Sequence, residues 1–264
     1  PLIAETGGMN AMIVDSSALT EQVVIDVLAS AFDSAGQRCS ALRVLCLQDE
    51  IADHTLKMLR GAMAECRMGN PGRLTTDIGP VIDSEAKANI ERHIQTMRSK
   101  GRQVFQAVRE NSEDAREWQS GTFVAPTLIE LDDFAELQKE VFGPVLHVVR
   151  YNRNQLPELI EQINASGYGL TLGVHTRIDE TIAQVTGSAQ VGNLYVNRNM
   201  VGAVVGVHPF GGEGLSGTGP KAGGPLYLYR LLANRPESAL AVTRARQDAE
   251  YPGDAQLKAA LTLP

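Results

Sequence analysis

The sequence has few of the residues that build disulfide scaffolds or metal centres. Its three cysteines, Cys39, Cys46 and Cys66, are too few and too odd in number for a disulfide framework, so we expect a reducing, cytoplasmic setting. The five histidines are scattered along the 264 residues, and no two of them have the spacing of metal ligands. The composition therefore predicts no metal site.

Long apolar runs and positive charge are also scarce. No stretch approaches the roughly 20 apolar residues of a membrane span. The first four residues, Pro1-Leu2-Ile3-Ala4, have neither the starting Met nor the basic region of a signal peptide, and we interpret the chain as part of a longer protein. The formal net charge of −7 argues against nucleic acid or an anionic membrane as the main partner.

The distribution of apolar residues predicts the fold class. Apolar runs typical of strands alternate with helical patterns of ten or more residues, so we expect an α/β domain with a mainly parallel, twisted sheet flanked by helices. Strands are expected at residues 2–4, 11–14, 42–47, 103–108, 123–125, 127–129, 145–150, 170–175 and 193–197. Helices are expected at residues 23–31, 51–66, 84–99, 157–166 and 179–188, with a short acidic one from Asp132. The pattern weakens near residue 234, which predicts one domain over residues 1–233 and a tail over residues 234–264.

One glycine motif resembles a nucleotide-binding loop but lacks the flanking elements. Residues 212–217 match GxGxxG, a fingerprint that indicates dinucleotide binding when a strand precedes it and a helix follows it. Pro209-Phe210-Gly211 precede this motif and Thr218-Gly219-Pro220 follow it. We therefore predict no nucleotide-binding fold within the chain itself.

Cys39, in Gly36-Gln37-Arg38-Cys39-Ser40, has two interpretations. A free cysteine is often an inert core residue. It can also be a nucleophile, because it follows a predicted helix, precedes a predicted strand, and lies between a cation and a hydroxyl that favour a reactive thiolate. Cys46 and Cys66, on a predicted strand and helix, are expected to be structural.

Two glutamates are further candidates. Glu5 can be an ordinary surface charge, but it stands between an expected strand and a Gly-Gly turn, where it could take a proton from water as a general base. Glu140, in Glu140-Val141-Phe142-Gly143-Pro144, can simply belong to a turn, or it can accept hydrogen bonds from ribose hydroxyls while Phe142 abuts a planar base.

The last candidate is glycine-rich. Val201-Gly202-Ala203 and His208-Pro209-Phe210-Gly211-Gly212 can form a surface loop with no ligand. Alternatively, free backbone N–H groups can bind an anion beside an aromatic wall.

The order of these motifs carries a resemblance. Glu5-Thr6-Gly7-Gly8, Gly36-Gln37-Arg38-Cys39, Glu140-Val141-Phe142-Gly143-Pro144, and Pro209-Phe210-Gly211-Gly212 with Ser216-Gly217 together resemble the aldehyde dehydrogenase superfamily. Cys39-Ser40, residues 201–206 and Gly223-Gly224-Pro225 are similar to the glutamate γ-semialdehyde (1-pyrroline-5-carboxylate) dehydrogenases. Residues 244–252 are similar to the bacterial bifunctional proline utilization A enzymes, which also carry a flavin (FAD) proline dehydrogenase.

The resemblance implies NAD-dependent oxidation of an aldehyde to an acid. Cys39 would attack the aldehyde carbon, its own backbone N–H would stabilise the oxyanion, and Glu5 would activate the water that hydrolyses the thioester. The residues implied on the cofactor side are Glu140, Phe142, Thr6 and Gly7. The residues implied on the substrate side are Ser40, Gly202, Ala203 and Phe210.

The family's other oxyanion donor (an Asn), its cofactor lysine and its NAD-binding domain lie upstream of Glu5, outside this chain. We therefore expect an NAD-binding domain in cis, a homo-oligomeric parent protein, and no working dehydrogenase activity from the 264 residues alone. FAD would belong only to the proline dehydrogenase part of the parent. Alternative functions are another semialdehyde dehydrogenase, such as one for succinate semialdehyde, or a non-catalytic structural piece. A CoA-acylating enzyme is less favoured because it needs no general base, and Glu5 is present.

Overall fold

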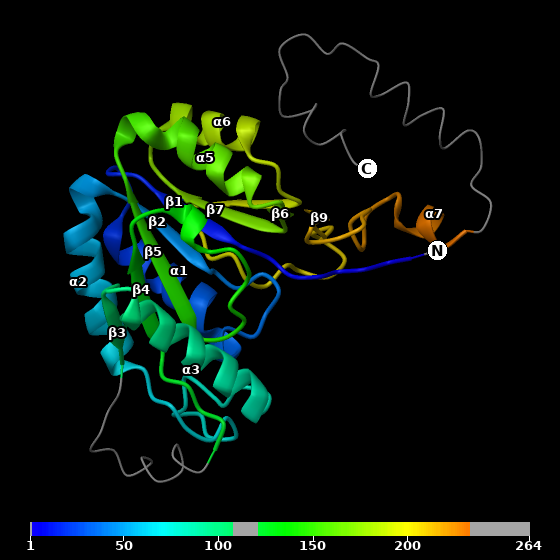
Figure 1. Cartoon of the computed structure of the whole chain (residues 1–264). Coiled ribbons are helices and arrows are strands. Elements are labelled where there is room, and N and C mark those ends of the chain that lie inside the picture. Colours follow the sequence, from blue (N-terminus) through cyan, green and yellow to red (C-terminus); the bar gives the residue numbers. More distant parts are fainter. Residues whose placement is uncertain (1, 108–120, 233–264) are drawn as a thin grey trace.

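The computed structural model describes residues 2–107 and 121–232 (Figure 1). The predicted tail, residues 234–264, and the last residue of the strand expected at 103–108 lie outside the described residues. The division into a domain and a tail therefore stays a prediction.

A seven-stranded sheet in the described residues has the order β3-β4-β5-β2-β1-β7-β8 (Figure 1). Its neighbouring strands run parallel, apart from the antiparallel pair β3–β4. The strands are β1 (Ala11–Val14), β2 (Val44–Gln48), β3 (Val104–Gln106), β4 (Thr127–Leu131), β5 (Val145–Tyr151), β7 (Thr171–His175) and β8 (Asn193–Val196). The expectation of a mainly parallel sheet flanked by helices is confirmed.

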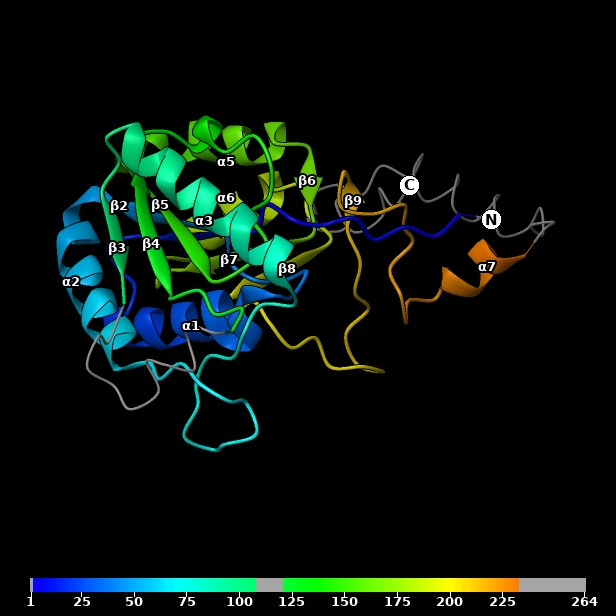
Figure 2. The same cartoon turned by 60° about the horizontal axis from the view of Figure 1, so that its bottom comes forward.

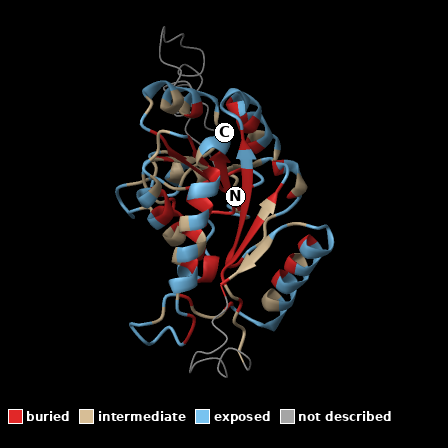
Figure 3. Cartoon of the chain, turned by 90° about the vertical axis from the view of Figure 1, so that its left-hand side faces the viewer, coloured by how far each residue is buried: buried red, intermediate tan, exposed pale blue. Residues whose placement is uncertain are grey.

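Helices cover both faces of the sheet; α1 and α5 lie on opposite sides of it (Figure 2). The helices are α1 (Thr20–Phe32), α2 (Asp49–Glu65), α3 (Ser84–Ser99), α5 (Leu156–Ala165), α6 (Asp179–Ser188) and α7 (Tyr227–Leu231), with 3-10 turns η1 (Asp33–Gly36), η2 (Phe134–Glu136) and η3 (Arg153–Gln155). The central strands β1 and β2 are buried along their whole length (Figure 3). Because both faces are covered, these strands are apolar runs without polar alternation.

Two of the predicted strands are absent. Residues 2–4 form no strand, because the chain there runs away from the sheet and pairs only through an isolated bridge between Glu5 and Gly217. Residues 123–125 form no strand either; they precede Pro126, which has no N–H to donate to a ladder. The short acidic helix expected from Asp132 is present as the 3-10 helix η2, whose N-cap Asp133 accepts from the Ala135 N–H.

The glycine motif at residues 212–217 belongs to a small second sheet. It contains β9 (Glu213–Gly214), which pairs antiparallel with β6 (Tyr168–Gly169), so it is not a phosphate loop. The N-terminal segment and the segment from β9 to α7 extend away from the main sheet side by side (Figures 1 and 2). The Ala4 N–H donates to the Thr218 hydroxyl at 3.1 Å, and the Arg230 guanidinium donates to the Leu2 carbonyl at 2.9 Å.

No helix among the described residues combines the length and apolar character that crossing a bilayer requires. No group of three or more His, Cys, Asp or Glu side chains in this part of the chain is arranged to hold a metal ion.

A histidine pair joins α3 to β5. His147 is 1% exposed, and its Nε2 lies 2.8 Å from Nε2 of His93, while its Nδ1 lies 3.1 Å from the carbonyl oxygen of Arg43. Burial is the main cause that lowers the pKa of both rings, and for His147 the neighbouring His93 lowers it further. Both rings are therefore neutral in the folded protein near pH 7.

This pair predicts acid sensitivity. The unfolded chain binds protons on these histidines near pH 6.5, whereas the folded chain does not. The free energy of unfolding therefore has its full value above about pH 6.5 and decreases as the pH falls below it, by up to about 1.4 kcal/mol per pH unit for His147. Urea unfolding at pH 7.5, 6.5 and 5.5 should show a shallower pH slope in His147→Asn than in the wild type. Equal slopes would contradict the assignment.

Candidate active site

The predicted nucleophile follows a turn of unusual backbone conformation. Ser34, Ala35 and Gly36 all have positive φ, at 55°, 53° and 65°, and non-glycine residues rarely adopt this region. An added Cβ on Gly36 would lie 2.2 Å from the carbonyl oxygen of Gly143. The turn therefore requires glycine at position 36, and it brings the loop before β5 against the cysteine loop.

Cys39 at the end of this turn is exposed, which contradicts the interpretation of an inert buried thiol. Cys46 is buried on β2, and burial raises the pKa of its thiol to about 12, as expected of a structural cysteine. Cys66, just after α2, is half-buried. Of the three thiols, Cys39 is the one that lies open to a ligand.

Asn10 holds the backbone of Cys39 in place. Its Nδ2 donates to the carbonyl oxygens of Cys39 at 2.7 Å and Ala41 at 2.8 Å, and its Oδ1 accepts from the Thr171 N–H at 3.2 Å. The side chain is 2% exposed and uses both of its N–H donors. Asn10 thus joins the amino ends of β1, β2 and β7 beneath the predicted nucleophile.

Arg43 is the buried cation of the site. It is 1% exposed and donates to Oε1 of Glu140 through Nη2 at 2.9 Å and Nε at 3.1 Å. Burial lowers the pKa of Arg43, and the charges of Glu140 and Cys39 raise it. Arg38, the cation expected to act on Cys39, instead donates through Nε to the Ser34 hydroxyl.

The predicted cofactor residues Gly7, Glu140 and Phe142 lie together. The Gly8 N–H donates to Oε2 of Glu140 at 3.2 Å, and an added Cβ on Gly7 would lie 2.5 Å from the same oxygen. The Phe142 ring centroid is 4.9 Å from the Arg43 guanidinium carbon. The Thr6 hydroxyl donates to the Leu215 carbonyl at 2.5 Å, so its role toward a cofactor stays a prediction.

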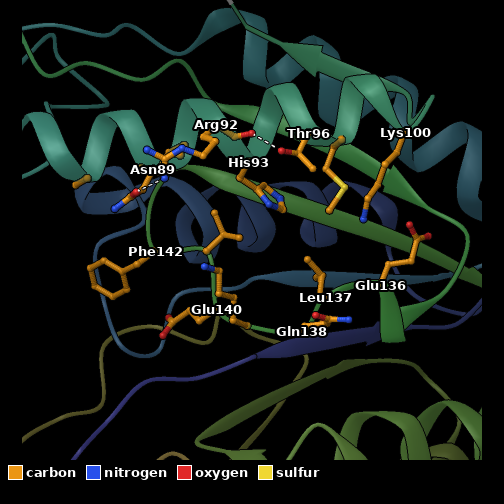
Figure 4. Close-up of a pocket in the computed structure, with 15 residues that line it drawn as sticks. Asn89, Arg92, His93, Thr96, Lys100, Glu136, Leu137, Gln138, Glu140 and Phe142 are labelled. Carbon is orange, nitrogen blue, oxygen red and sulfur yellow. Dashed lines mark hydrogen bonds between the residues drawn. The ribbon is translucent and has the colours of Figure 1, made fainter.

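Glu140 and Phe142 border a pocket of about 900 Å³ between α3 and residues 136–142. His93 and Lys100 extend into it from α3, opposite Leu137 and Gln138 (Figure 4). Carboxylate oxygens have about four acceptor positions, and Glu140 uses three of them on Arg43 and Gly8. Among the described residues nothing occupies the fourth position, which fits the hydroxyl groups of a ribose.

Glu5 lies against the glycine-rich segment that follows β8. An added Cβ on Gly217 would be 2.9 Å from its Oε2, and one on Gly211 would be 3.6 Å from its Oε1. Burial raises the pKa of Glu5, and a hydrogen bond from the Gly212 backbone opposes this rise. A raised pKa is the direction that suits a general base.

The predicted substrate residues come from two segments that meet at Ser30. The carbonyl of Ser30 accepts from the Leu42 N–H at 2.9 Å, just after Ser40, and its hydroxyl accepts from the Met200 N–H at 2.9 Å, just before Gly202. Ser40 is 7% exposed and has no hydrogen bond to its hydroxyl within residues 2–107 and 121–232. Gly202 has a φ of +80° with open space where a Cβ would lie, and Ala203 is half-buried.

Phe210, the other predicted substrate residue, is half-buried and is held by its backbone. Its N–H donates to the carbonyl of Ala222 at 3.0 Å, and the Ala222 N–H donates back at 2.8 Å. Phe210 directly precedes Gly211 and Gly212, the glycines next to Glu5.

Three supporting residues were not predicted from the sequence: Asn10, Ser30 and Arg43. For Arg43 a signal existed, because a single arginine interrupts the apolar run at residues 42–47, and a charge there must be paired if the run is buried. Ser30 and Asn10 gave no such signal, since a small polar residue next to a helix end or a strand is common.

The turn before Cys39 yields a prediction with a matched control. Gly36→Ala should lower the free energy of unfolding by about 2–5 kcal/mol, because the new methyl group meets the Gly143 backbone and the residue keeps a positive φ. Gly61→Ala, in α2 with open space around its Cβ position, should be neutral or stabilising by up to about 1 kcal/mol. Urea unfolding measures both changes, and a wild-type midpoint for Gly36→Ala would contradict the close packing.

Comparison with known proteins gives the family. A model of the aldehyde dehydrogenase family matches residues 1–233. The bifunctional protein PutA of Escherichia coli (strain K12) is 97% identical over 264 residues, which are 100% of this chain and 20% of that protein. The chain thus spans about a fifth of the length of this curated relative.

Two solved structures are also similar to this chain. A crystal structure of a bifunctional proline utilization A protein matches with a TM-score of 0.80 at 54% identity, over 86% of this chain and 22% of that chain. A 1-pyrroline-5-carboxylate dehydrogenase from Thermus with bound NAD matches with a TM-score of 0.75 at 35% identity, over 86% of this chain and 42% of that chain. With a family model that covers nearly all the described residues, this chain belongs to the aldehyde dehydrogenase family.

Proposed function

We propose that this chain is the catalytic part of an NAD-dependent dehydrogenase that oxidises glutamate γ-semialdehyde, formed from 1-pyrroline-5-carboxylate, to glutamate. The observation that carries the proposal is the exposed Cys39, whose carbonyl accepts from Asn10. The carbonyl of the preceding Arg38 accepts from Arg43, which is paired with the Glu140 carboxylate. The names of the relatives support the substrate: PutA and a 1-pyrroline-5-carboxylate dehydrogenase with bound NAD.

The covalent chemistry begins at Cys39. Its thiolate attacks the aldehyde carbon and forms a carbon–sulfur bond, and the Cys39 N–H stabilises the resulting oxyanion. NAD⁺ supplies the acceptor for the hydride that leaves this carbon. The product is a thioester on Cys39, oxidised by two electrons relative to the aldehyde.

Glu5 completes the reaction. Its carboxylate takes a proton from water, the oxygen of that water adds to the thioester carbon, and the carbon–sulfur bond breaks. Glutamate and the Cys39 thiolate are released. The raised pKa of Glu5 makes it a stronger base than an ordinary surface glutamate.

Substrate selection is assigned to Ser40, Gly202 and Ala203. One hydroxyl and two backbone N–H groups are a suitable set of donors for a carboxylate, and the Ser40 hydroxyl has no competing hydrogen bond in the described part of the chain. Phe210 would line the path of the aliphatic portion. The Ser30 contacts support this arrangement, because they bring residues 40 and 202 to the same end of α1.

The cofactor side is assigned to Glu140, Phe142 and Gly7, with Thr6 beside them. Glu140 would accept a hydrogen bond from the nicotinamide ribose at its fourth acceptor position. The same proposal includes an NAD-binding domain in cis and a parent protein that is homo-oligomeric and cytoplasmic. FAD would bind only in a separate proline dehydrogenase part of that parent.

The substrate assignment is tested by two aldehydes. In a full-length protein that carries this chain, kcat/KM for glutamate γ-semialdehyde should exceed that for succinate semialdehyde by at least about tenfold. Both substrates end in a carboxylate, but succinate semialdehyde is one carbon shorter and has no amino group, so its carboxylate should not reach the donors near Ser40 while its carbonyl lies at Cys39. Ser40→Ala should reduce this ratio. Equal values for the two aldehydes would favour a different semialdehyde as the substrate.

Glu5→Gln tests the general base separately. The variant should retain the first rapid formation of NADH, because hydride transfer precedes hydrolysis, while steady-state turnover falls by about 10²–10⁴-fold. Rapid-mixing absorbance at 340 nm separates the two phases. A variant with wild-type turnover would refute the role of Glu5.

A further inference from the structure

The Arg43 side chain uses all the hydrogen-bond donors that it has. A guanidinium has five N–H groups, and Arg43 makes five hydrogen bonds to four acceptors. Two go to Oε1 of Glu140. The other three go to main-chain carbonyls: Nη1 donates to Gly36 at 2.7 Å and to Gly143 at 3.2 Å, and Nη2 donates to Arg38 at 3.1 Å.

These acceptors belong to separate parts of the active site. Gly36 and Arg38 lie in the loop that ends at Cys39, while Gly143 and Glu140 lie in the segment before β5. Through Glu140, the contact reaches a third part, because Oε2 of Glu140 accepts the Gly8 N–H of the turn that follows Glu5. One buried guanidinium therefore joins the segments of the predicted nucleophile, ribose carboxylate and general base.

We propose that Arg43 is a positioning residue that couples the Cys39 loop to Glu140, so that the reactivity of the thiol and the affinity for the cofactor depend on the same side chain. This inference rests on the proposed function. Arg43 acts through its neighbours and does not itself touch the reacting atoms. The charge of Cys39 also raises the pKa of the Arg43 guanidinium.

A lysine cannot reproduce this arrangement. Its ammonium has three donors around one point, whereas the acceptors of Arg43 lie around a planar fork. Arg43→Lys keeps the positive charge that Glu140 needs and removes the simultaneous contacts to the Gly36, Arg38 and Gly143 carbonyls. The variant therefore separates positioning from charge.

The test uses a full-length protein that carries this chain, with variants Arg43→Lys, Glu140→Gln and the double variant. Two quantities are measured: KM for NAD⁺, and the rate of Cys39 alkylation by iodoacetamide without substrate or cofactor. Arg60→Lys is the matched control, because Arg60 pairs with Glu130 at 2.5 Å away from these segments. Circular dichroism and thermal unfolding establish that each variant is folded.

Arg43→Lys should raise KM for NAD⁺ at least about tenfold, since a charge-assisted bidentate contact is lost, and should change the alkylation rate at least about threefold. In the Glu140→Gln background, the effect of Arg43→Lys on KM should largely disappear, whereas its effect on alkylation should remain. If Arg43 had a purely structural role, the variant would be less stable, and the Glu140→Gln background would not separate the effect on KM from the effect on alkylation. Arg60→Lys should change neither quantity.

Two results would overturn the inference: wild-type values of both quantities in folded Arg43→Lys, or fully additive effects on KM in the double variant. If Arg43→Lys does not fold, Glu140→Gln alone decides the coupling. Glu140 makes no hydrogen bond to residues 36–39 within the described chain, so an unchanged alkylation rate in Glu140→Gln would refute the link. Absence of glutamate γ-semialdehyde oxidation by the wild type would instead refute the proposed function, and the alkylation measurements would still test Arg43.

Discussion

The buried ion pair between Arg43 and Glu140 is the interaction on which the rest of the candidate site depends. Removing two charges from water is costly, and such a pair persists only when every remaining donor and acceptor is satisfied. Arg43 meets this condition with three backbone carbonyls. Glu140, which is 13% exposed, accepts the Gly8 N–H and, within the described residues, keeps one acceptor position for a ligand. These same bonds fix the loops before β1, β2 and β5. Because the buried arginine must be paired and hydrogen-bonded, its contacts hold these segments together although they lie far apart in the sequence.

This placement is at the amino ends of the parallel strands, which reverses the usual rule for α/β sheets. Ligands normally bind beyond the carboxyl ends of the strands, and the expectation for Glu5 used that rule. At the carboxyl ends of β1 and β7, side chains bond to one another: Asp15 accepts from the Ser17 N–H and hydroxyl and from the Thr176 hydroxyl. After β8 the chain returns along α1, since Gln22 contacts Asn197 and Ser30 contacts Met200. That return brings residues 201–203 back to the edge where Cys39 lies.

The sequence was sufficient for the parts of the structure that local pattern determines. Strand β1 and helices α3 and α6 match their predicted bounds, because apolar periodicity and helix ends are local signals. The fold class and the candidate residues Cys39 and Glu140 were likewise accessible from motifs. The roles of Asn10, Arg43 and Ser30 were not, because each depends on at least one distant partner, which lies 29, 97 and 170 residues away, respectively. The positive φ of Ser34 and Ala35 was also inaccessible, since serine and alanine have no local preference for this conformation.

The two groups of candidate residues differ in how firmly the fold supports them. The Cys39 carbonyl accepts from Asn10, and Glu140 accepts from Arg43 and from the Gly8 N–H. Asn10 and Arg43 are at most 2% exposed, and they directly precede β1 and β2, which are buried throughout. The segment with Gly202 and Ala203 is held at its start by Ser30, and beyond that Val204 and Val205 are 51% and 98% exposed. Covalent chemistry requires fixed geometry, whereas recognition of an end group tolerates adjustment. Rigid support for the thiol and a more exposed loop after β8 are therefore consistent with the proposed roles, in which the sheet would fix the reacting groups and the loop after β8 would select the aldehyde.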